Sequence, residues 1–162
     1  MGEELGELRR THLCGELRRE HVPQEVVLMG WVHRRRNHGG LIFINLRDRE
    51  GVVQVVFNPQ VAVSAHAKAG QLRSEYVVAI QGTVVERPTG TANPNLSTGE
   101  VEVVATELTI LAEANPLPFS LDGEEEVSEA LRFKYRYLDL RRPGLQRNLI
   151  VRHRVAKAIR DY

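Results

Sequence analysis

The side chains of this sequence that could do chemistry are those able to contact unpaired nucleobases. The ring of Phe43 can stack on a base, an interaction worth about 1–3 kcal/mol that depends little on base identity. The Gln54 amide offers a donor and an acceptor to a base edge, and the Glu102 carboxylate can accept hydrogen bonds from guanine. The guanidinium groups of Arg34 and Arg36 suit phosphate or a base edge. Together these residues predict a site for single-stranded nucleic acid.

Each of these residues also has an ordinary structural interpretation. Phe43 could be a core residue at the end of a barrel, and Gln54 and Glu102 could be surface residues. The arginine run could be a solvated strand end. Residues 87–99, which are rich in turn formers and in side chains such as Asn93, could be a flexible hairpin. The residue types alone leave both interpretations open.

Five segments rich in β-branched and aromatic residues predict the strands that must position these side chains. They span residues 26–32, 41–46, 52–57, 76–85 and 101–111. The Ala-rich segment 61–72 predicts a helix between the third and fourth strands. This order predicts a mainly β fold, the five-stranded Greek-key barrel called the OB-fold, which binds oligonucleotides on its second and third strands and in two loops. Those loops are residues 34–40 and 87–99 in this chain.

Alternation along the second predicted strand divides its side chains between two faces. Ile42, Ile44 and Leu46 share one face, whereas Leu41, Phe43, Asn45 and Arg47 share the other. Phe43 is therefore predicted to lie with polar groups, where a base could reach it. The same alternation sends Arg35 to the face opposite Arg34 and Arg36.

The charge pattern divides the rest of the chain. Residues 113–129 hold six acidic residues and no basic one, whereas residues 132–160 hold ten Lys or Arg against one Asp. Prolines and few apolar residues predict a linker, 113–130, between an OB-fold domain, 1–112, and a basic segment, 131–162. From Arg147 onward apolar residues recur at helical spacing, and no capping residue follows, so we expect a piece of a longer protein.

Composition excludes several other classes of protein. The 162 residues are 42% hydrophobic with a formal net charge of +1, which fits one globular domain with an appendage. No segment approaches the roughly 20 apolar residues of a membrane span, and no secretion signal is present, so a cytoplasmic location is expected. The lone Cys14 predicts a small buried residue, and the histidines lack the spacing of metal ligands.

Several motifs resemble one family of enzymes. Gly30-Trp31-Val32-His33-Arg34-Arg35-Arg36 and the block 40–51 closely resemble the N-terminal domain of bacterial aspartyl-tRNA synthetases, which belong to class II. The segments 10–12, 98–103 and 134–143 are similar to the same family, so the resemblance covers nearly the whole chain. The basic segment resembles the start of a class II catalytic domain, including a helix of the dimer interface.

The resemblance implies a role for each candidate residue. Phe43 would stack on the anticodon, Gln54 would face its middle uridine, and Arg36 would help to fix the loop. Glu102 would recognise the first base, a guanine or its derivative. Asn93 would lie near the third base, the one base that differs between the aspartate and asparagine anticodons.

Two further positions bear on that third base. His38 and Gly90 resemble the subgroup that charges both tRNA(Asp) and tRNA(Asn), whereas strictly aspartate-specific enzymes tend to carry a leucine and a bulkier residue there. Such small or adaptable side chains would relax discrimination, because specificity requires a penalty against the wrong ligand. Arg34 is a candidate for backbone contact, and Arg141 and Arg142 could contact the tRNA backbone or pair internally.

The resemblance also implies an enzyme, although not within these residues. The parent would be an aspartate–tRNA ligase that uses ATP and Mg to form aspartyl-adenylate and charges tRNA(Asp), and also tRNA(Asn). The family's catalytic motifs lie beyond residue 162, so this chain is expected to bind tRNA with no catalytic residue, metal or cofactor of its own. The parent would form a homodimer and would need a tRNA-dependent amidotransferase to convert Asp-tRNA(Asn).

Two alternatives to tRNA recognition remain. A stand-alone OB-fold module could use the same ring and arginines for any single strand, although it would not need the basic block after the linker. A protein-interaction module could instead use the Arg and Glu residues in ion pairs.

Overall fold

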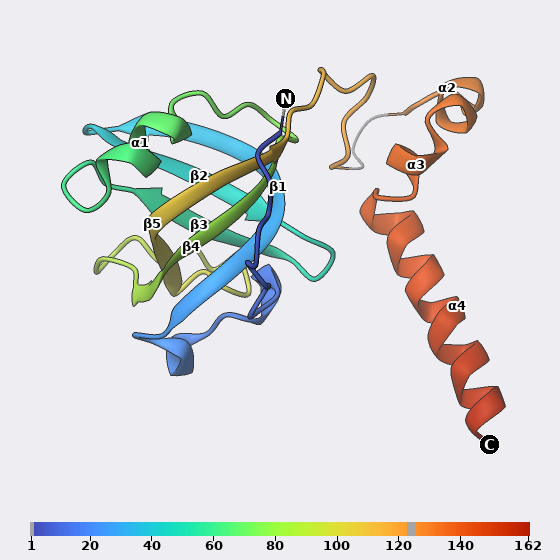
Figure 1. Cartoon of the computed structure of the whole chain (residues 1–162). Helices are drawn as coiled ribbons and strands as arrows, with labels where there is room; N and C mark the ends of the chain where they lie inside the picture. The colour runs from blue at the N-terminus through green and yellow to red at the C-terminus, as the bar shows by residue number, and fades with distance from the viewer. Residues whose placement is uncertain (1, 123–125) are drawn as a thin grey trace. The chain divides into compact units, whose positions relative to one another are not determined.

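The computed structural model describes residues 2–122 and 126–162, which form two compact units, Met1–Asn115 and Pro116–Tyr162. The first unit contains five strands and the second contains three helices (Figure 1). Residues 123–125 of the predicted linker lie outside the described residues. In the described part of the chain, none of the helices combines the length and the apolar character that crossing a membrane requires.

The five strands of the first unit form a closed barrel in the order β1-β2-β3-β5-β4. They are β1 (Glu25–His38), β2 (Leu41–Arg47), β3 (Val52–Phe57), β4 (Val77–Glu86) and β5 (Val101–Ala112). β3 and β5 pair in parallel, and the other neighbouring strands are antiparallel. The prediction of a mainly β, five-stranded fold is confirmed.

β1 continues past its predicted end at residue 32 and includes the arginine run. Arg36 pairs with Phe43 and His38 pairs with Leu41, after a register shift between Val32 and Arg34. The turn is reduced to Gly39 and Gly40, whose φ angles of +58° and +80° suit a two-residue hairpin. The loop predicted over residues 34–40 is therefore mostly strand, because β2 extends alongside it and pairs with its backbone.

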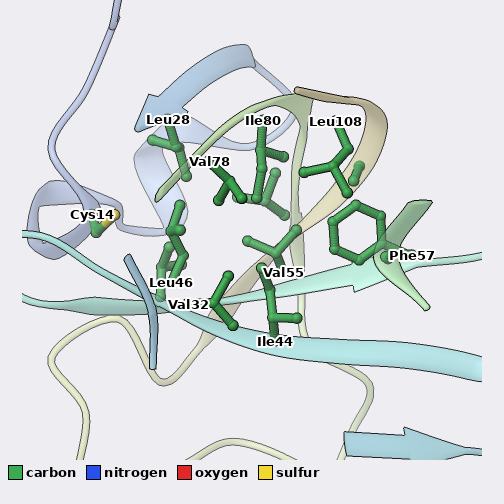
Figure 2. Close-up of a cluster of buried hydrophobic side chains, with 14 of the residues drawn as sticks. Cys14, Leu28, Val32, Ile44, Leu46, Val55, Phe57, Val78, Ile80 and Leu108 are labelled. Carbon is green, nitrogen blue, oxygen red and sulfur yellow. The ribbon is translucent and has the colours of Figure 1, made fainter. Parts of the chain in front are cut away.

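Aliphatic side chains from alternating positions fill the barrel (Figure 2). On β2, Ile42, Ile44 and Leu46 are buried, whereas Phe43 and the other residues of its face are only half-buried, as the alternation predicts. The phenylalanine of the core is Phe57, on β3. Cys14 is also buried in this cluster, as predicted, and burial raises the pKa of its thiol.

Short helical elements join and flank the strands. Two 3-10 turns, η1 (Cys14–Glu16) and η2 (Arg19–His21), precede β1. Between β3 and β4 the chain forms α1 (Val63–Ala69), which occupies the middle of the segment predicted to be helical. Ala65 and Ala69 of α1 are buried in the barrel core, so this short helix is attached to the barrel through its small residues.

The second unit contains α2 (Glu129–Lys134), α3 (Arg136–Asp139) and α4 (Pro143–Asp161). α4 begins at Pro143 and not at Arg147, because proline is favoured in the first turn of a helix. Phe119, Leu121 and Leu138 are buried together in a small core. Part of the stretch predicted as a linker therefore packs, since its few apolar residues find partners on α2 and α3.

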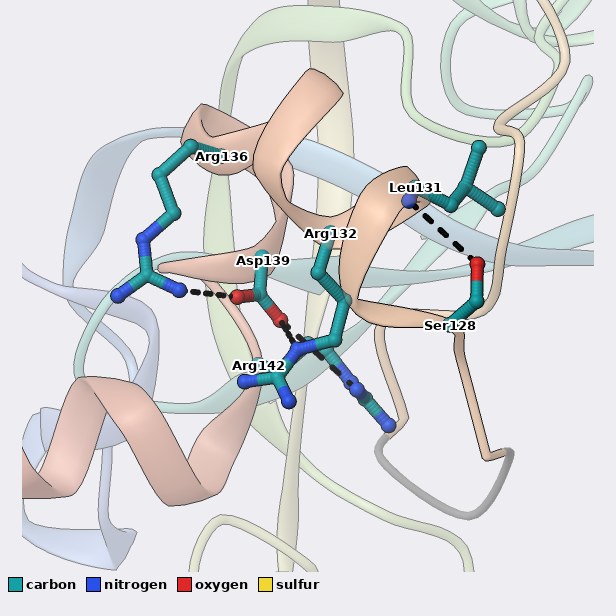
Figure 3. A network of polar contacts seen from close by, with 6 residues as sticks. All are labelled: Ser128, Leu131, Arg132, Arg136, Asp139 and Arg142. Atoms are coloured by element: carbon teal, nitrogen blue, oxygen red, sulfur yellow. Dashed lines mark hydrogen bonds and ion pairs between the residues drawn. The ribbon is translucent and has the colours of Figure 1, made fainter.

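A buried carboxylate organises the polar side of the second unit (Figure 3). Asp139 is 0% exposed, and its oxygens lie 3.0 Å from Arg132 Nε, 2.6 Å from Arg136 Nη1 and 3.8 Å from Arg142 Nη1. Of the two alternatives considered for Arg142, the structure shows an internal ion pair. Arg141, the neighbouring candidate for backbone contact, is half-buried.

Candidate nucleic-acid interface

A cavity of about 770 Å³ on the first unit brings together most of the candidate residues. Its volume is in the range of small-ligand sites. The lining comes from β1, β2, β3 and the loop between β4 and β5, and consists of Arg34, Arg36, Asn37, His38, Phe43, Asn45, Gln54, Arg87, Thr91, Asn93 and Leu96. The predicted OB-fold ligand region and the observed cavity therefore coincide.

β1 and β2 present one polar face to this cavity. Arg34 and Arg36 line it, whereas Arg35 points to the other side and donates to the carbonyl groups of Ala69 and Gly70. Arg36 is the cross-strand neighbour of Phe43, and both side chains line the cavity. The alternation of side chains along the two strands produces this arrangement, as predicted.

A hydrogen-bonded chain of three side chains connects the cavity to β5. Arg36 Nη2 donates to Gln54 Oε1 at 3.3 Å, and Gln54 Nε2 donates to Glu102 Oε2 at 2.8 Å. Gln54 and Glu102 are only 9% and 8% exposed, so each needs these partners to offset its burial. Gln54 lines the cavity, whereas Glu102 is not among the lining residues and meets it through Gln54.

Arg87 is a cavity residue that the sequence did not single out. Its Nε donates to the carbonyl of Val101 at 3.1 Å, and its buried Nη2 makes no hydrogen bond within the described residues. Burial lowers the pKa of this guanidinium, the Glu102 carboxylate raises it, and Arg36 lowers it further. Arg87 stays charged at physiological pH, so its unused N–H groups require an acceptor. The sequence feature that could have pointed to Arg87 is its position immediately before Pro88, at the start of the loop between β4 and β5.

The loop between β4 and β5 holds Asn93 through its backbone. Asn93 N–H donates to Gly99 O at 2.9 Å, and Asn93 Oδ1 accepts from Asn95 N–H at 3.0 Å. Gly90 is exposed with a φ of +84° beside the lining residue Thr91, and the space that a Cβ would occupy there is open. A larger residue at position 90 would thus have room but an unfavourable backbone conformation.

The predicted site residues fall into three groups by location. Arg34, Arg36, His38, Phe43, Gln54 and Asn93 line the cavity, Glu102 and Gly90 adjoin residues that line it, and Arg141 and Arg142 belong to the second unit. The cavity offers an aromatic face, four side-chain amides and three guanidinium groups. This set can stack on a flat ring and hydrogen-bond to its edge, which is the chemistry of binding unpaired bases.

The comparisons with known proteins agree on the fold of the first unit. The model of the family described as OB-fold nucleic acid binding domain matches residues 26–111. An asparaginyl-tRNA synthetase from Pyrococcus horikoshii, solved with asparaginyl-adenylate, superposes with a TM-score of 0.78 at 27% identity, covering 95% of this chain and 34% of that one. An OBody bound to hen egg-white lysozyme superposes with a TM-score of 0.56 at 28% identity, covering 66% of this chain and 97% of the OBody.

The sequence relatives are longer proteins. The aspartate–tRNA(Asp/Asn) ligase of Desulfotalea psychrophila is 57% identical over 160 residues, which are 99% of this chain and 26% of that protein. The ligase of the same name from Geotalea uraniireducens is 58% identical over 158 residues, which are 98% of this chain and 27% of that protein. The chain thus spans about a quarter of the length of these relatives.

Proposed function

Because this chain belongs to the family of OB-fold nucleic acid binding domains, we propose that its barrel recognises the anticodon loop of a tRNA. The observation that carries the proposal is the cavity in which the Phe43 ring and the Gln54 amide lie together. An unstacked base can lie on such a ring while its edge pairs with the amide. The ligase relatives support tRNA as the source of that base.

Each side chain retains the hydrogen-bonding capacity that its proposed role needs. Phe43 stacks on the anticodon, and Gln54 contacts the middle uridine with its second N–H and second lone pair, since an amide has two of each. Glu102 accepts from a guanine at the first position through Oε1, because Oε2 is bonded to Gln54. Asn93 donates to the third base through Nδ2, because its Oδ1 is bonded to Asn95.

The arginines that line the cavity have two kinds of proposed role, because one holds other groups in place and two contact the RNA. Arg36 is bonded to Gln54 and fixes both the amide and the anticodon loop. Arg87 supplies its buried Nη2 donor to a base carbonyl or a phosphate, which would remove the cost of leaving that group unsatisfied. Arg34, exposed at the cavity, contacts the tRNA backbone. Arg141 is a candidate for further backbone contact from the second unit, and Arg142 is a candidate only through the donors that its ion pair with Asp139 does not use.

For the whole protein we propose an aspartate–tRNA ligase that works in the cytoplasm as a homodimer. ATP and Mg would be used by residues outside this chain to form aspartyl-adenylate, and aspartate would pass to tRNA(Asp). The similarity to aspartate–tRNA(Asp/Asn) ligases supports this activity, and these relatives are long enough to hold a catalytic domain in addition to the matched segment. This chain is the part of that enzyme that selects the tRNA.

The same enzyme would also charge tRNA(Asn). Gly90 brings no side chain to the edge of the cavity, and the His38 imidazole that lines the cavity can either donate or accept, so neither residue penalises one third base over another. The mischarged Asp-tRNA(Asn) would then require a tRNA-dependent amidotransferase. Aminoacylation of tRNA(Asp) and tRNA(Asn) by the full-length ligase is the test, and we expect both to accept aspartate. If tRNA(Asn) is not charged, the dual specificity is wrong.

Binding to three RNA stem-loops tests anticodon recognition by the 162-residue chain. The loops carry GUC, GUU or an unrelated anticodon on the same stem, and fluorescence anisotropy gives each Kd. We expect GUC and GUU to bind comparably and the unrelated loop to bind more weakly. Equal binding of all three would favour a general single-strand module.

One comparison favours a second candidate, a protein-binding surface. The OBody superposes on the barrel and is bound to lysozyme, so a barrel of this shape can bind a protein. Salt titration separates the two candidates. Phosphate contacts make affinity for RNA fall steeply with ionic strength. On a single strand, the slope of log K against log salt is about −0.7 for each phosphate neutralised.

A further inference from the structure

Helix α1 is bonded to the β1–β2 hairpin at two places. His66 Nε2 lies 2.9 Å from the carbonyl oxygen of Gly40 in the turn. A carbonyl oxygen only accepts, so this imidazole nitrogen carries the proton. Arg35, in the middle of the arginine run, donates to the carbonyl groups of Ala69, at 3.4 Å, and Gly70 at the C-terminal end of α1. The helix therefore holds both the turn and the strand that leads to it.

These bonds are made on the side of β1 away from the cavity. Arg34 and Arg36 line the cavity, and Arg35 between them points to α1. Residues 34–40 are all exposed, so this end of the hairpin gains little from apolar burial. Its conformation therefore depends on the ladder with β2, on the Arg36–Gln54 bond and on the polar contacts from α1.

α1 itself is firmly attached to the barrel. Ala65 and Ala69 are buried in the core, and Lys68 Nζ pairs with Glu3 at 2.6 Å and donates to Leu108 O at 3.3 Å. A contact from such a fixed helix can restrain a neighbouring hairpin. The same hairpin carries Arg36 and His38 into the cavity.

We propose that His66 and Arg35 are positioning residues for the anticodon site, which hold the hairpin so that Arg36 and His38 are already in place before the tRNA binds. The inference rests on the proposed function. Neither residue touches the ligand. Without them the hairpin must be ordered on binding, and the cost of ordering one or two of its side chains corresponds to a roughly tenfold weaker complex.

Variants of His66 in the 162-residue chain test the bond to the turn. His66→Ala should raise the Kd for the GUC stem-loop about tenfold. His66→Gln, which keeps an N–H donor, should recover most of the affinity, and Ser64→Ala, on an exposed residue of the same helix, should leave it unchanged. Wild-type affinity in His66→Ala would overturn the positioning role of His66.

Salt titration tests whether Arg35 acts through position and not through contact. Arg35→Ala should weaken binding at every salt concentration and leave the slope of log K against log salt unchanged. Arg34→Ala, in the cavity, should reduce that slope by about 0.7 for one lost phosphate contact. A similar reduction in slope for Arg35→Ala would make Arg35 a ligand contact and overturn its positioning role.

Amide hydrogen exchange of the free chain provides a readout without RNA. Exchange over residues 37–41 should quicken in His66→Ala and Arg35→Ala, while core residues of β3 and β5 keep their wild-type rates. If the wild-type chain shows no preference for GUC, the proposed function falls and this inference with it. If that preference stands while both variants keep wild-type affinity and exchange, this inference alone falls.

Discussion

Two phenylalanines on neighbouring strands have opposite environments. Phe43, on β2, is half-buried at the cavity, whereas Phe57, on β3, is fully buried in the barrel core. Truncating the Phe43 ring should therefore weaken ligand binding, whereas truncating the Phe57 ring should lower the free energy of unfolding.

Phe43→Ala should weaken binding of the GUC stem-loop by about 5- to 150-fold, which corresponds to the roughly 1–3 kcal/mol of one stacked base. Phe43→Tyr keeps the aromatic face and should bind nearly as the wild type does. Fluorescence anisotropy measures both, and the melting temperature should change little. Phe57→Ala is the opposite control, since a core truncation costs about 3–5 kcal/mol of stability. Unchanged binding in Phe43→Ala would remove the ring from the site.

Glu102→Gln should relax the preference for guanine at the first anticodon position. The amide can still bond to Gln54, but one acceptor becomes a donor that faces the donors of guanine. Loss of a hydrogen bond to a charged acceptor is worth about 1.5–3 kcal/mol, so GUC should lose roughly 10- to 150-fold while a loop with adenine first loses less. Glu100→Gln, exposed and paired with Arg19, is the matched control. Equal losses for both loops would contradict the assignment.

The sequence predicted the face of Phe43 but not the importance of Arg87. Strand alternation depends on local geometry alone, so the polar side of β2 could be assigned from residue spacing. The burial of Arg87 depends on β5 and on Glu102, which are close to it only after the barrel has closed. A long-range environment of this kind leaves no periodic signal in the sequence.

At the scale of elements, the β1–β2 hairpin shows where strand propensity fails. Three consecutive arginines are poor evidence for a strand, yet β1 runs through them because β2 pairs with their backbone. The five-strand order was predictable, since each remaining strand has its own apolar pattern. The packing of Phe119 and Leu121 was not, because prolines and acidic residues dominate the composition around them.

Gly39→Val should destabilise this hairpin. The φ of +58° at Gly39 is left-handed, and a side chain there costs about 1–2 kcal/mol, with a further penalty for a β-branched residue. We expect a melting temperature lower by several degrees and weaker binding of GUC, since Arg36 and His38 lie on this hairpin. Gly39→Asn, which tolerates positive φ, is the control and should remain close to wild type. A Val variant as stable as the Asn variant would contradict the turn geometry.

At the scale of the whole molecule, the described residues form two separate hydrophobic cores. The barrel unit encloses its aliphatic cluster, and the helical unit encloses Phe119, Leu121 and Leu138 beside the buried Asp139. We therefore expect each unit to have its own stability, so that a single unfolding free energy does not describe the chain. Substitutions in one core should act on that unit alone.

Asp139→Asn tests this independence. The change leaves Arg132, Arg136 and Arg142 around a neutral amide, and breaking a buried charge pair costs about 3–5 kcal/mol. We expect the free energy of unfolding of the second unit to fall by about 3 kcal/mol, at the low end of this range. The side chains of Arg132 and Arg136 are 33% and 45% exposed, so water can replace part of their interaction with Asp139. Amide exchange over α2 and α3 should quicken by roughly a hundredfold, the factor that this energy implies for local opening.

Measurements on the barrel complete this test of independence. Asp139→Asn should leave amide exchange in β3 and β5 and binding of the GUC stem-loop at their wild-type values. Val53→Ala, in the barrel core, should do the opposite: it should quicken amide exchange in β3 and leave exchange in α2 and α3 unchanged. Asp161→Asn, at an exposed position in the last turn of α4, controls for the loss of one charge. If Asp139→Asn instead loosens the barrel strands, the two units share one cooperative unfolding transition, and affinity for RNA should then fall together with the stability of the helices.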